Sequence, residues 1–318
     1  MENTENTQNG QTAPVQTLGE YCKGLELPYT NPRPWMNPRV VVPENQFCVI
    51  RVDGRAFHTF THHFKTKDSV FSEKIIGAMK AAAEALAREL HPVVIYGQSD
   101  EITAVVAPGN AIFGGKCHKL NSIAAATATQ AFNEYLAKEE LRKVLEECDS
   151  VELVKYHYEN LGRRSMNPGG KAALFDARTY GASRDDVLRI LIWRQQDAIK
   201  NSISTVALSV FSHKALSGKN SDERISMLAG RGVDWHSYSM DCKYGFTLFN
   251  RTVEEPVDPE KLKKAGVAEQ YIRRLVDSGA STVRRPILDY VTLPPFKRIK
   301  NFDDVIFGQA EPILKEDA

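Results

Sequence analysis

Two short apolar segments, each ending in acidic residues beside a glycine, most constrain how this 318-residue chain can fold. The first is Val49-Ile50-Arg51-Val52-Asp53-Gly54, and the second leads into Gly97-Gln98-Ser99-Asp100-Glu101. Runs of β-branched residues bounded by turn-forming residues are typical of β-strands. Each acidic group is therefore expected at the end of a strand.

The order of the segments predicts an α+β fold with a β-α-β-β-α-β core. Strands are expected at residues 47–53, 92–96, 102–107 and 172–175, with a turn at 97–100. A helix is expected at 70–90, after an N-cap at Asp68 or Ser69, and another at 118–136. In this ferredoxin-like arrangement the third strand lies between the first two and is antiparallel to both. The arrangement brings Asp53 and Asp100 to adjoining strand ends.

The chain is expected to have three parts. Residues 1–38 are interpreted as a disordered or extended tail, because the first 20 are polar and the rest are rich in proline. Residues 39–248 form the main domain, with further helices at 184–211 and 222–231. Residues 249–318, with weaker periodicity, are interpreted as a C-terminal extension.

Composition excludes some classes of protein. The formal charge is +1, so the chain has no overall field that attracts nucleic acid. The five cysteines are scattered without a C-x-x-C pair, which argues against a disulfide framework or a zinc ribbon. No apolar run approaches the roughly 18 residues of a membrane span, and the N-terminus does not resemble a signal peptide. We therefore expect a cytoplasmic protein with no membrane partner.

Paired carboxylates indicate a metal site. Two acids held close together repel each other, so a cation usually compensates them. Magnesium takes oxygen ligands, and two such ions can activate an attacking oxygen and stabilise a leaving one. Asp53 and Asp100 are the expected ligands, and Gly54 would let its carbonyl approach the metal. The alternative is that Asp53 caps a turn and Asp100-Glu101 decorates a hairpin.

The turn after the first strand is a candidate nucleotide-binding segment. The amides of Gly54-Arg55-Ala56-Phe57-His58 are able to hold a triphosphate, and Phe57 to stack on a base. The alternative places Phe57 in the core. Lys116 and Lys119 are candidates for reaching phosphate, against the alternative of solvated lysines. The sequences Gly114-Gly115-Lys116 and Gly169-Gly170-Lys171 lack the P-loop frame, and His58, His62 and His63 lack the spacing of a zinc site.

Four ordered motifs resemble those of the tRNA-His guanylyltransferase family. They are Asp53-Gly54-Arg55-x-Phe57-His58, Tyr96-Gly97-Gln98-Ser99-Asp100-Glu101, Phe175-Asp176-Ala177-Arg178 and Trp193-Arg194-Gln195-x-Asp197. The stretch from Leu228 to Tyr238 and Lys243-Tyr244-Gly245 are similar as well. The resemblance covers roughly residues 40 to 248.

The resemblance implies a palm-like domain that adds nucleotides in the 3′-to-5′ direction with two magnesium ions. Such enzymes activate a 5′-monophosphate of tRNA with ATP, and the 3′-hydroxyl of GTP or another nucleoside triphosphate then attacks the activated end. Matching by residue makes Asp53, the Gly54 carbonyl and Asp100 metal ligands. Residues 53–58 with Ser99 would hold nucleotide, Glu101 and Lys119 would assist, and a homo-oligomer, a dimer or tetramer, is expected.

One departure bears on the substrate. Members that add a single guanosine carry His-x-Asn-Asn after the Trp-Arg-Gln motif, whereas this chain has Ile199-Lys200-Asn201-Ser202. The missing histidine favours the guanylyltransferase-like branch, which repairs truncated 5′ ends by templated addition. The alternatives are guanosine addition to tRNA-His, a palm-fold nucleotide cyclase, and an RNA-binding protein on an inactive palm.

Overall fold

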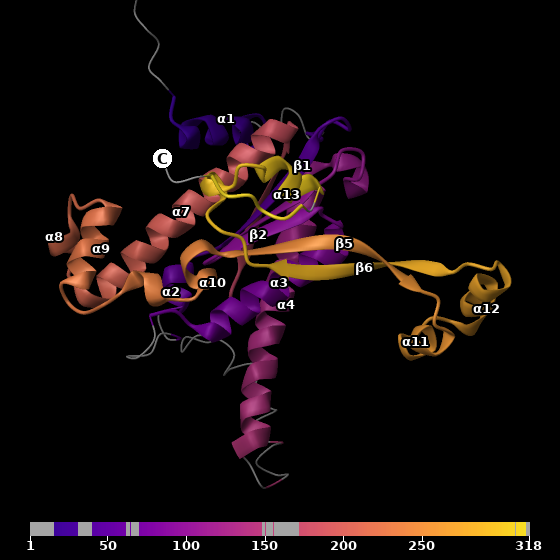
Figure 1. The fold of residues 1–318 in the computed structure, drawn as a ribbon. Helices are drawn as coiled ribbons and strands as arrows, with labels where there is room; N and C mark the ends of the chain where they lie inside the picture. Colours follow the sequence, from indigo (N-terminus) through magenta and orange to yellow (C-terminus); the bar gives the residue numbers. More distant parts are fainter. Residues whose placement is uncertain are drawn as a thin grey trace, which may run out of the picture.

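The fold is built around one six-stranded antiparallel sheet (Figure 1). The computed structural model describes residues 16–30, 40–61, 64, 70–147, 150, 155, 172–308 and 310–315. The strands are β1 (Phe47–Gly54), β2 (Val94–Gln98), β3 (Glu101–Val106), β4 (Phe175–Ala182), β5 (Phe246–Pro256) and β6 (Thr282–Val291). The longer helices are α1 (Leu18–Thr30), α3 (Glu73–Leu90), α4 (Cys117–Glu147) and α7 (Arg184–Val210). The shorter ones are α2 (Phe57–Thr61), α8 (His213–Leu216), α9 (Ser221–Ala229), α10 (Met240–Tyr244), α11 (Pro259–Lys264), α12 (Glu269–Asp277) and α13 (Phe302–Gly308).

The strand order β4-β1-β3-β2-β5-β6 contains the predicted ferredoxin-like core. As predicted, β3 lies between β1 and β2 and is antiparallel to both. The register pairs Asp53 with Glu101, and the amide of Gly54 donates a 3.0 Å hydrogen bond to the carbonyl of Asp100. The end of β1 is therefore hydrogen-bonded to the turn and the strand start that carry Asp100 and Glu101.

Helices cover both faces of the sheet because the strands alternate between two apolar cores. In β1, Cys48, Ile50 and Val52 pack toward α3 and α4, whereas Phe47 and Val49 pack toward α7, α1 and α13 (Figure 1). The alternation continues along β1 to Arg51 and Asp53, which therefore lie on the α7 side. A third core, around Trp235 and Leu228, joins the end of α7 to α9 and α10.

The expected tail is wrong for residues 18–30, which form α1. Leu18, Tyr21, Cys22 and Leu25 recur at helical spacing and pack on the α7-side core, and Cys22 is fully buried. These residues form a short apolar face on α1. The face is hard to recognise in the sequence because the surrounding residues are polar. The remainder of the expected tail at residues 1–15 and 31–38 lies outside the described residues.

Several element boundaries differ from the predictions. Gly97 and Gln98 belong to β2, so the turn is only Ser99-Asp100, and α4 continues to Glu147. The last core strand begins where its prediction ended, at Phe175, and runs to Ala182. The α3 helix has Ser72 as its N-cap, whereas the expected caps Asp68 and Ser69 lie outside the described residues, as do His62, His63 and the 169–171 segment.

The expected boundary at 248/249 falls inside β5, which joins the sheet beside β2. Strands β5 and β6 then continue beyond the sheet as a two-stranded arm, with α11 and α12 at its far end (Figure 1). Ile272 is the buried residue of these two helices. The chain returns from the arm to pack α13 against the α7-side core. Among the described helices, none is long and apolar enough to span a membrane.

Candidate active site

The predicted acids meet where β1 ends and β3 begins. Asp53 and Asp100 are both half-buried, and the tight turn that connects β2 to β3 places Ser99 at a positive φ of 49°. Gly54 is required here, because a Cβ at this position would lie 2.3 Å from the ring of Phe57. The site therefore depends on a glycine and a strained turn held between two bonded strands.

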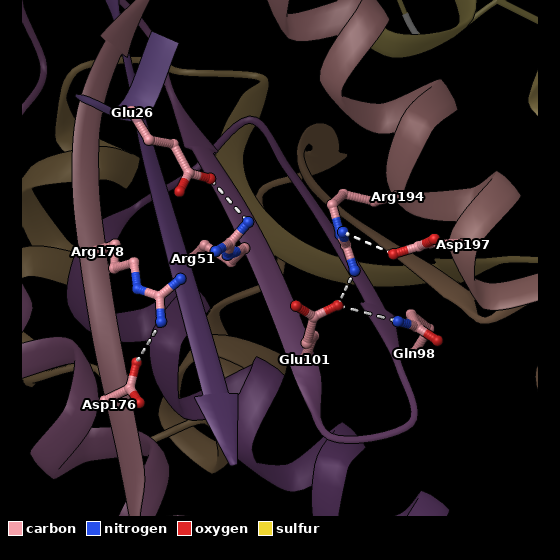
Figure 2. Close-up of polar contacts among 8 residues, drawn as sticks. All are labelled: Glu26, Arg51, Gln98, Glu101, Asp176, Arg178, Arg194 and Asp197. Carbon is pink, nitrogen blue, oxygen red and sulfur yellow. Dashed lines mark hydrogen bonds and ion pairs between the residues drawn. The ribbon is translucent and has the colours of Figure 1, made fainter. Parts of the chain in front are cut away.

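Three arginines line the same hollow as these acids. Each arginine is paired with a different carboxylate (Figure 2). Arg51 pairs with Glu26 of α1 at 2.7 Å, and Arg178 lies 3.9 Å from Asp176. Arg194 of α7 contacts Glu101 and also Asp197, the latter at 3.2 Å. Gln98 donates a further 3.1 Å hydrogen bond to Glu101.

This pairing separates Glu101 from the other two acids. Glu101 is neutralised by Arg194, whereas within the described part of the chain no lysine or arginine forms an ion pair with Asp53 or Asp100. Burial, together with the nearby Glu101, Asp100 and Asp176 carboxylates and opposed by Arg51, raises the pKa of Asp53 to about 6. Burial likewise raises the pKa of Asp100. The uncompensated negative charge lies on Asp53 and Asp100.

The donor set suits a hard cation that keeps water and phosphate ligands. The described residues contain no group of three His, Cys, Asp or Glu side chains arranged for a metal. Magnesium needs only one or two carboxylates when substrate phosphates complete its shell. Asp53, Asp100 and the Gly54 carbonyl would hold it, and Glu101, occupied by Arg194, would stabilise their surroundings rather than bind metal.

Two hollows adjoin the acids and share Gln98, Asp100 and Asn201. One, of about 450 Å³, is lined by charged groups that include Arg51, Asp53 and Arg178. The other, of about 260 Å³, lies between α3, α7 and α10 and is largely apolar, with Ile75, Met79 and Phe246 in its wall. A charged hollow beside an apolar one matches the two chemistries of a nucleotide, a phosphate chain and a base.

The residues of the expected nucleotide-binding turn differ in their exposure to solvent. Arg55, Ala56 and His58 are exposed, and Ala56 has a positive φ of 53°. Phe57 is 5% exposed and packs against Phe60, Phe132 and Phe175, which favours the core alternative over stacking on a base. Phe57, His58 and Ser99 all line the apolar hollow.

Lys119 is not brought to the acids. Lys119 lies in the first turn of α4, and its ammonium is 4.4 Å from the ring centroid of Phe113. The part of α4 level with the site is near Thr129, whose hydroxyl accepts a hydrogen bond from the Phe175 amide next to Gly54. Ten residues of helix separate these positions, about 15 Å at the usual rise. The nucleotide-binding role of Lys119 stays a prediction.

Sequence reasoning missed Glu26 and gave Arg51 no role. Glu26 lies in the segment interpreted as a tail, although α1 buries it to 7% exposure. Arg51 is the charged residue among the five apolar ones of residues 47–52, a pattern that indicates a buried partner for the arginine.

The residues of the divergent stretch 199–202, which follows the Trp-Arg-Gln motif, have different surroundings. Ile199 packs against the core around Trp235, and the buried Ser202 hydroxyl accepts a 2.8 Å hydrogen bond from the Trp235 indole. Asn201 is exposed and lines both hollows. Asn201 is therefore the residue of this stretch that contributes to both hollows, and Ser202 contributes to the apolar one.

Comparison with known proteins agrees with the motifs. Residues 36–181 match the tRNAHis guanylyltransferase family. A probable tRNA(His) guanylyltransferase of Dictyostelium discoideum is 24% identical over 74% of this chain and 83% of its own length. A probable tRNA(His) guanylyltransferase of Drosophila melanogaster is 39% identical over 24% of this chain and 27% of its own length.

Solved structures give the same fold. A bacterial tRNA(His) guanylyltransferase-like protein in complex with ATP aligns with a TM-score of 0.53 and 27% identity, over 73% of this chain and 88% of its own. The Saccharomyces cerevisiae tRNA(His) guanylyltransferase aligns with a TM-score of 0.51 and 19% identity, over 66% of this chain and 87% of its own. The predicted palm fold and the resemblance to this family of nucleotidyltransferases are confirmed.

Proposed function

We propose that this chain is a magnesium-dependent 3′–5′ nucleotidyltransferase that adds nucleotides to the 5′ end of tRNA. The observation that carries the proposal is the pair Asp53 and Asp100, which no described lysine or arginine neutralises and which lie beside a charged hollow. The family match, and the ATP bound by the bacterial relative, support the same reaction.

The reaction requires two successive displacements at phosphorus. In the first, an oxygen of the RNA 5′-phosphate attacks the α-phosphorus of ATP and pyrophosphate leaves. In the second, the 3′-hydroxyl of GTP or another nucleoside triphosphate attacks the RNA 5′-phosphorus and AMP leaves. Bound magnesium would lower the charge on the attacked phosphoryl group and promote loss of the attacking hydroxyl proton.

The residues of this chain would position the reactants. Asp53, Asp100 and the Gly54 carbonyl would hold the cation, and the arginine-rich hollow would receive phosphate. The apolar hollow beside Ser99 would take a base. Glu101 would act indirectly, because its pairing with Arg194 fixes α7 against the start of β3.

Templated repair of truncated 5′ ends is the favoured form of this activity. Ile199 replaces the histidine typical of members that add a single guanosine, and its side chain packs into a core instead of facing the site. Asn201 is the residue of this stretch whose side chain lines both hollows, and Ser202 lines the apolar one.

The test is extension of 5′-end-labelled tRNA by purified protein with magnesium, ATP and all four nucleoside triphosphates. A tRNA lacking its first nucleotide and full-length tRNA-His are the two substrates. We expect extension of the truncated tRNA by the missing nucleotide, abolished in D53A and D100A and retained in D185N, an exposed acid at the start of α7.

Other products identify the alternatives. A single guanosine added only to tRNA-His would show that Ile199 does not mark repair. Cyclic nucleotides formed from ATP or GTP without RNA would indicate a cyclase. RNA binding without any product in wild-type protein would indicate an inactive palm.

A further inference from the structure

We propose that Glu26 of the N-terminal helix is a positioning residue that holds Arg51 away from Asp53 and so keeps the metal site negatively charged. This inference rests on the proposed function, because it concerns the same carboxylates. It assigns a role to α1, which precedes the region that matches the family.

The first observation is burial of opposite charges. Glu26 and Arg51 are each 7% exposed, and the Arg51 Nη1 atom lies 2.7 Å from the Glu26 Oε1 atom. A buried guanidinium requires a carboxylate close by, since leaving one member of such a pair alone is strongly unfavourable. Glu26 is the ion-pair partner of Arg51 in the described part of the chain.

The second observation is the position of Arg51 on β1. Arg51 and Asp53 are two residues apart in one strand, so their side chains lie on the same face, about 7 Å apart along the backbone. Both line the charged hollow. A guanidinium released from Glu26 would have Asp53 as its next acid along β1, within the reach of an arginine side chain.

The third observation is that the other arginines already have partners. Arg194 contacts Glu101 and Asp197, and Arg178 lies near Asp176. Each arginine of the hollow is paired with an acid other than Asp53 and Asp100, and Lys23 also lines the hollow. Removing the carboxylate at position 26 would leave Arg51 without its ion-pair partner.

The fourth observation is that α1 is firmly attached where Glu26 needs it. Cys22 is fully buried in the α7-side core, and the Tyr21 hydroxyl donates a 2.6 Å hydrogen bond to Asp186 of α7. Gly19 lies against Trp193, since a Cβ there would come 3.2 Å from the indole nitrogen. These contacts fix the helix that carries Glu26.

The experiment measures metal binding directly, without turnover. Mn²⁺ is the probe, because it prefers the same oxygen ligands and free Mn²⁺ is quantified by electron paramagnetic resonance. The full-length wild type, E26Q, R51M, E26Q/R51M, D53N and the exposed-helix control E20Q are compared, and thermal melts report folding. E26D, which keeps the charge, is included as the conservative variant.

We expect E26Q to weaken Mn²⁺ binding about tenfold, as loss of a group behind a metal ligand commonly does. R51M should restore the E26Q protein to within about twofold of wild type, because the two substitutions remove one interaction. E26D and E20Q should bind as wild type does. A purely structural role for Glu26 would lower the melting temperature without this rescue.

Binding by E26Q equal to wild type, or a double variant as weak as E26Q, would overturn the inference. Should E26Q fail to fold, R51M decides: retained Mn²⁺ binding supports the inference and lost binding overturns it. Wild-type protein that binds Mn²⁺ no better than D53N would instead refute the metal assignment, and this inference with it.

Discussion

At the scale of single residues, the site is a set of charges in which each carboxylate has a distinct environment. Glu101 and Glu26 are matched to arginines, whereas Asp53 and Asp100 face one another's negative potential. Carboxylates that lie near one another in the fold thus serve different purposes, because pairing with an arginine decides which of them is available to a cation.

The pKa of Asp53 predicts how the metal-free protein responds to pH. Its folded value of about 6 lies above the ordinary 3.8, so the folded state holds a proton that the unfolded state has lost between these values. In EDTA, the melting temperature of wild type should therefore fall as pH rises from about 4 to 6, relative to D53N. A D53N curve parallel to wild type across this range would contradict the assignment.

Sequence reasoning reached the acids but not their surroundings. Asp53 and Asp100 were predictable because strand patterns end at them and the segment order forces those ends together. Phe57, exposed in the interpretation as a base-stacking ring, is buried, since its partners Phe132 and Phe175 come from distant segments. Glu26 was not predictable, because nothing in the local pattern of α1 shows that Arg51 lies beneath it.

At the scale of elements, β2 is fitted closely between β3 and β5. Gly97 lies in the buried strand β2 opposite Phe246 of β5, and a Cβ at Gly97 would come 2.2 Å from the Phe246 ring. The aromatic ring thus occupies the space that a side chain on β2 would take, and it forms part of the wall of the apolar hollow.

Substituting Gly97 by alanine should therefore lower the free energy of unfolding by about 2 kcal/mol, the usual cost of overpacking. G97A/F246L should recover part of the loss, because leucine vacates the ring's position. The matched control is G24A on α1, where a Cβ meets no atom within 4 Å and alanine favours the helix. Urea denaturation measures all three, and equal effects of G97A and G24A would contradict this packing.

At the scale of the whole molecule, the sheet of the palm is buried under helices, whereas the two-stranded arm is not. The sheet up to Phe249 is covered on both faces by helices, whereas the outer parts of β5 and β6 are paired only with each other. Isolated two-stranded hairpins are marginally stable, so the arm depends on the palm from which it extends. The palm has no such dependence on the tip of the arm.

Replacing residues 257–281 by an Asn-Gly turn should therefore preserve the palm. Pro256 and Thr282 are paired across the arm, which leaves a two-residue connection as a natural closure. We expect a melting temperature within about 4 °C of the full chain, a shift that corresponds to at most about 1–2 kcal/mol, and unchanged Mn²⁺ binding. Loss of cooperative melting would show that the tip supports the palm.

The central position of β1 has a consequence for biosynthesis. One edge of β1 pairs with β3, and its other edge pairs with β4. Since β4 begins more than a hundred residues after β1 ends, this second edge stays unpaired until β4 has been synthesised. At roughly 5–20 residues per second, translation leaves that edge uncovered for on the order of ten seconds. An apolar strand with an open edge is a template for intermolecular pairing. This edge of the nascent chain is thus exposed to aggregation in the interval between emergence of β1 and emergence of β4 from the ribosome.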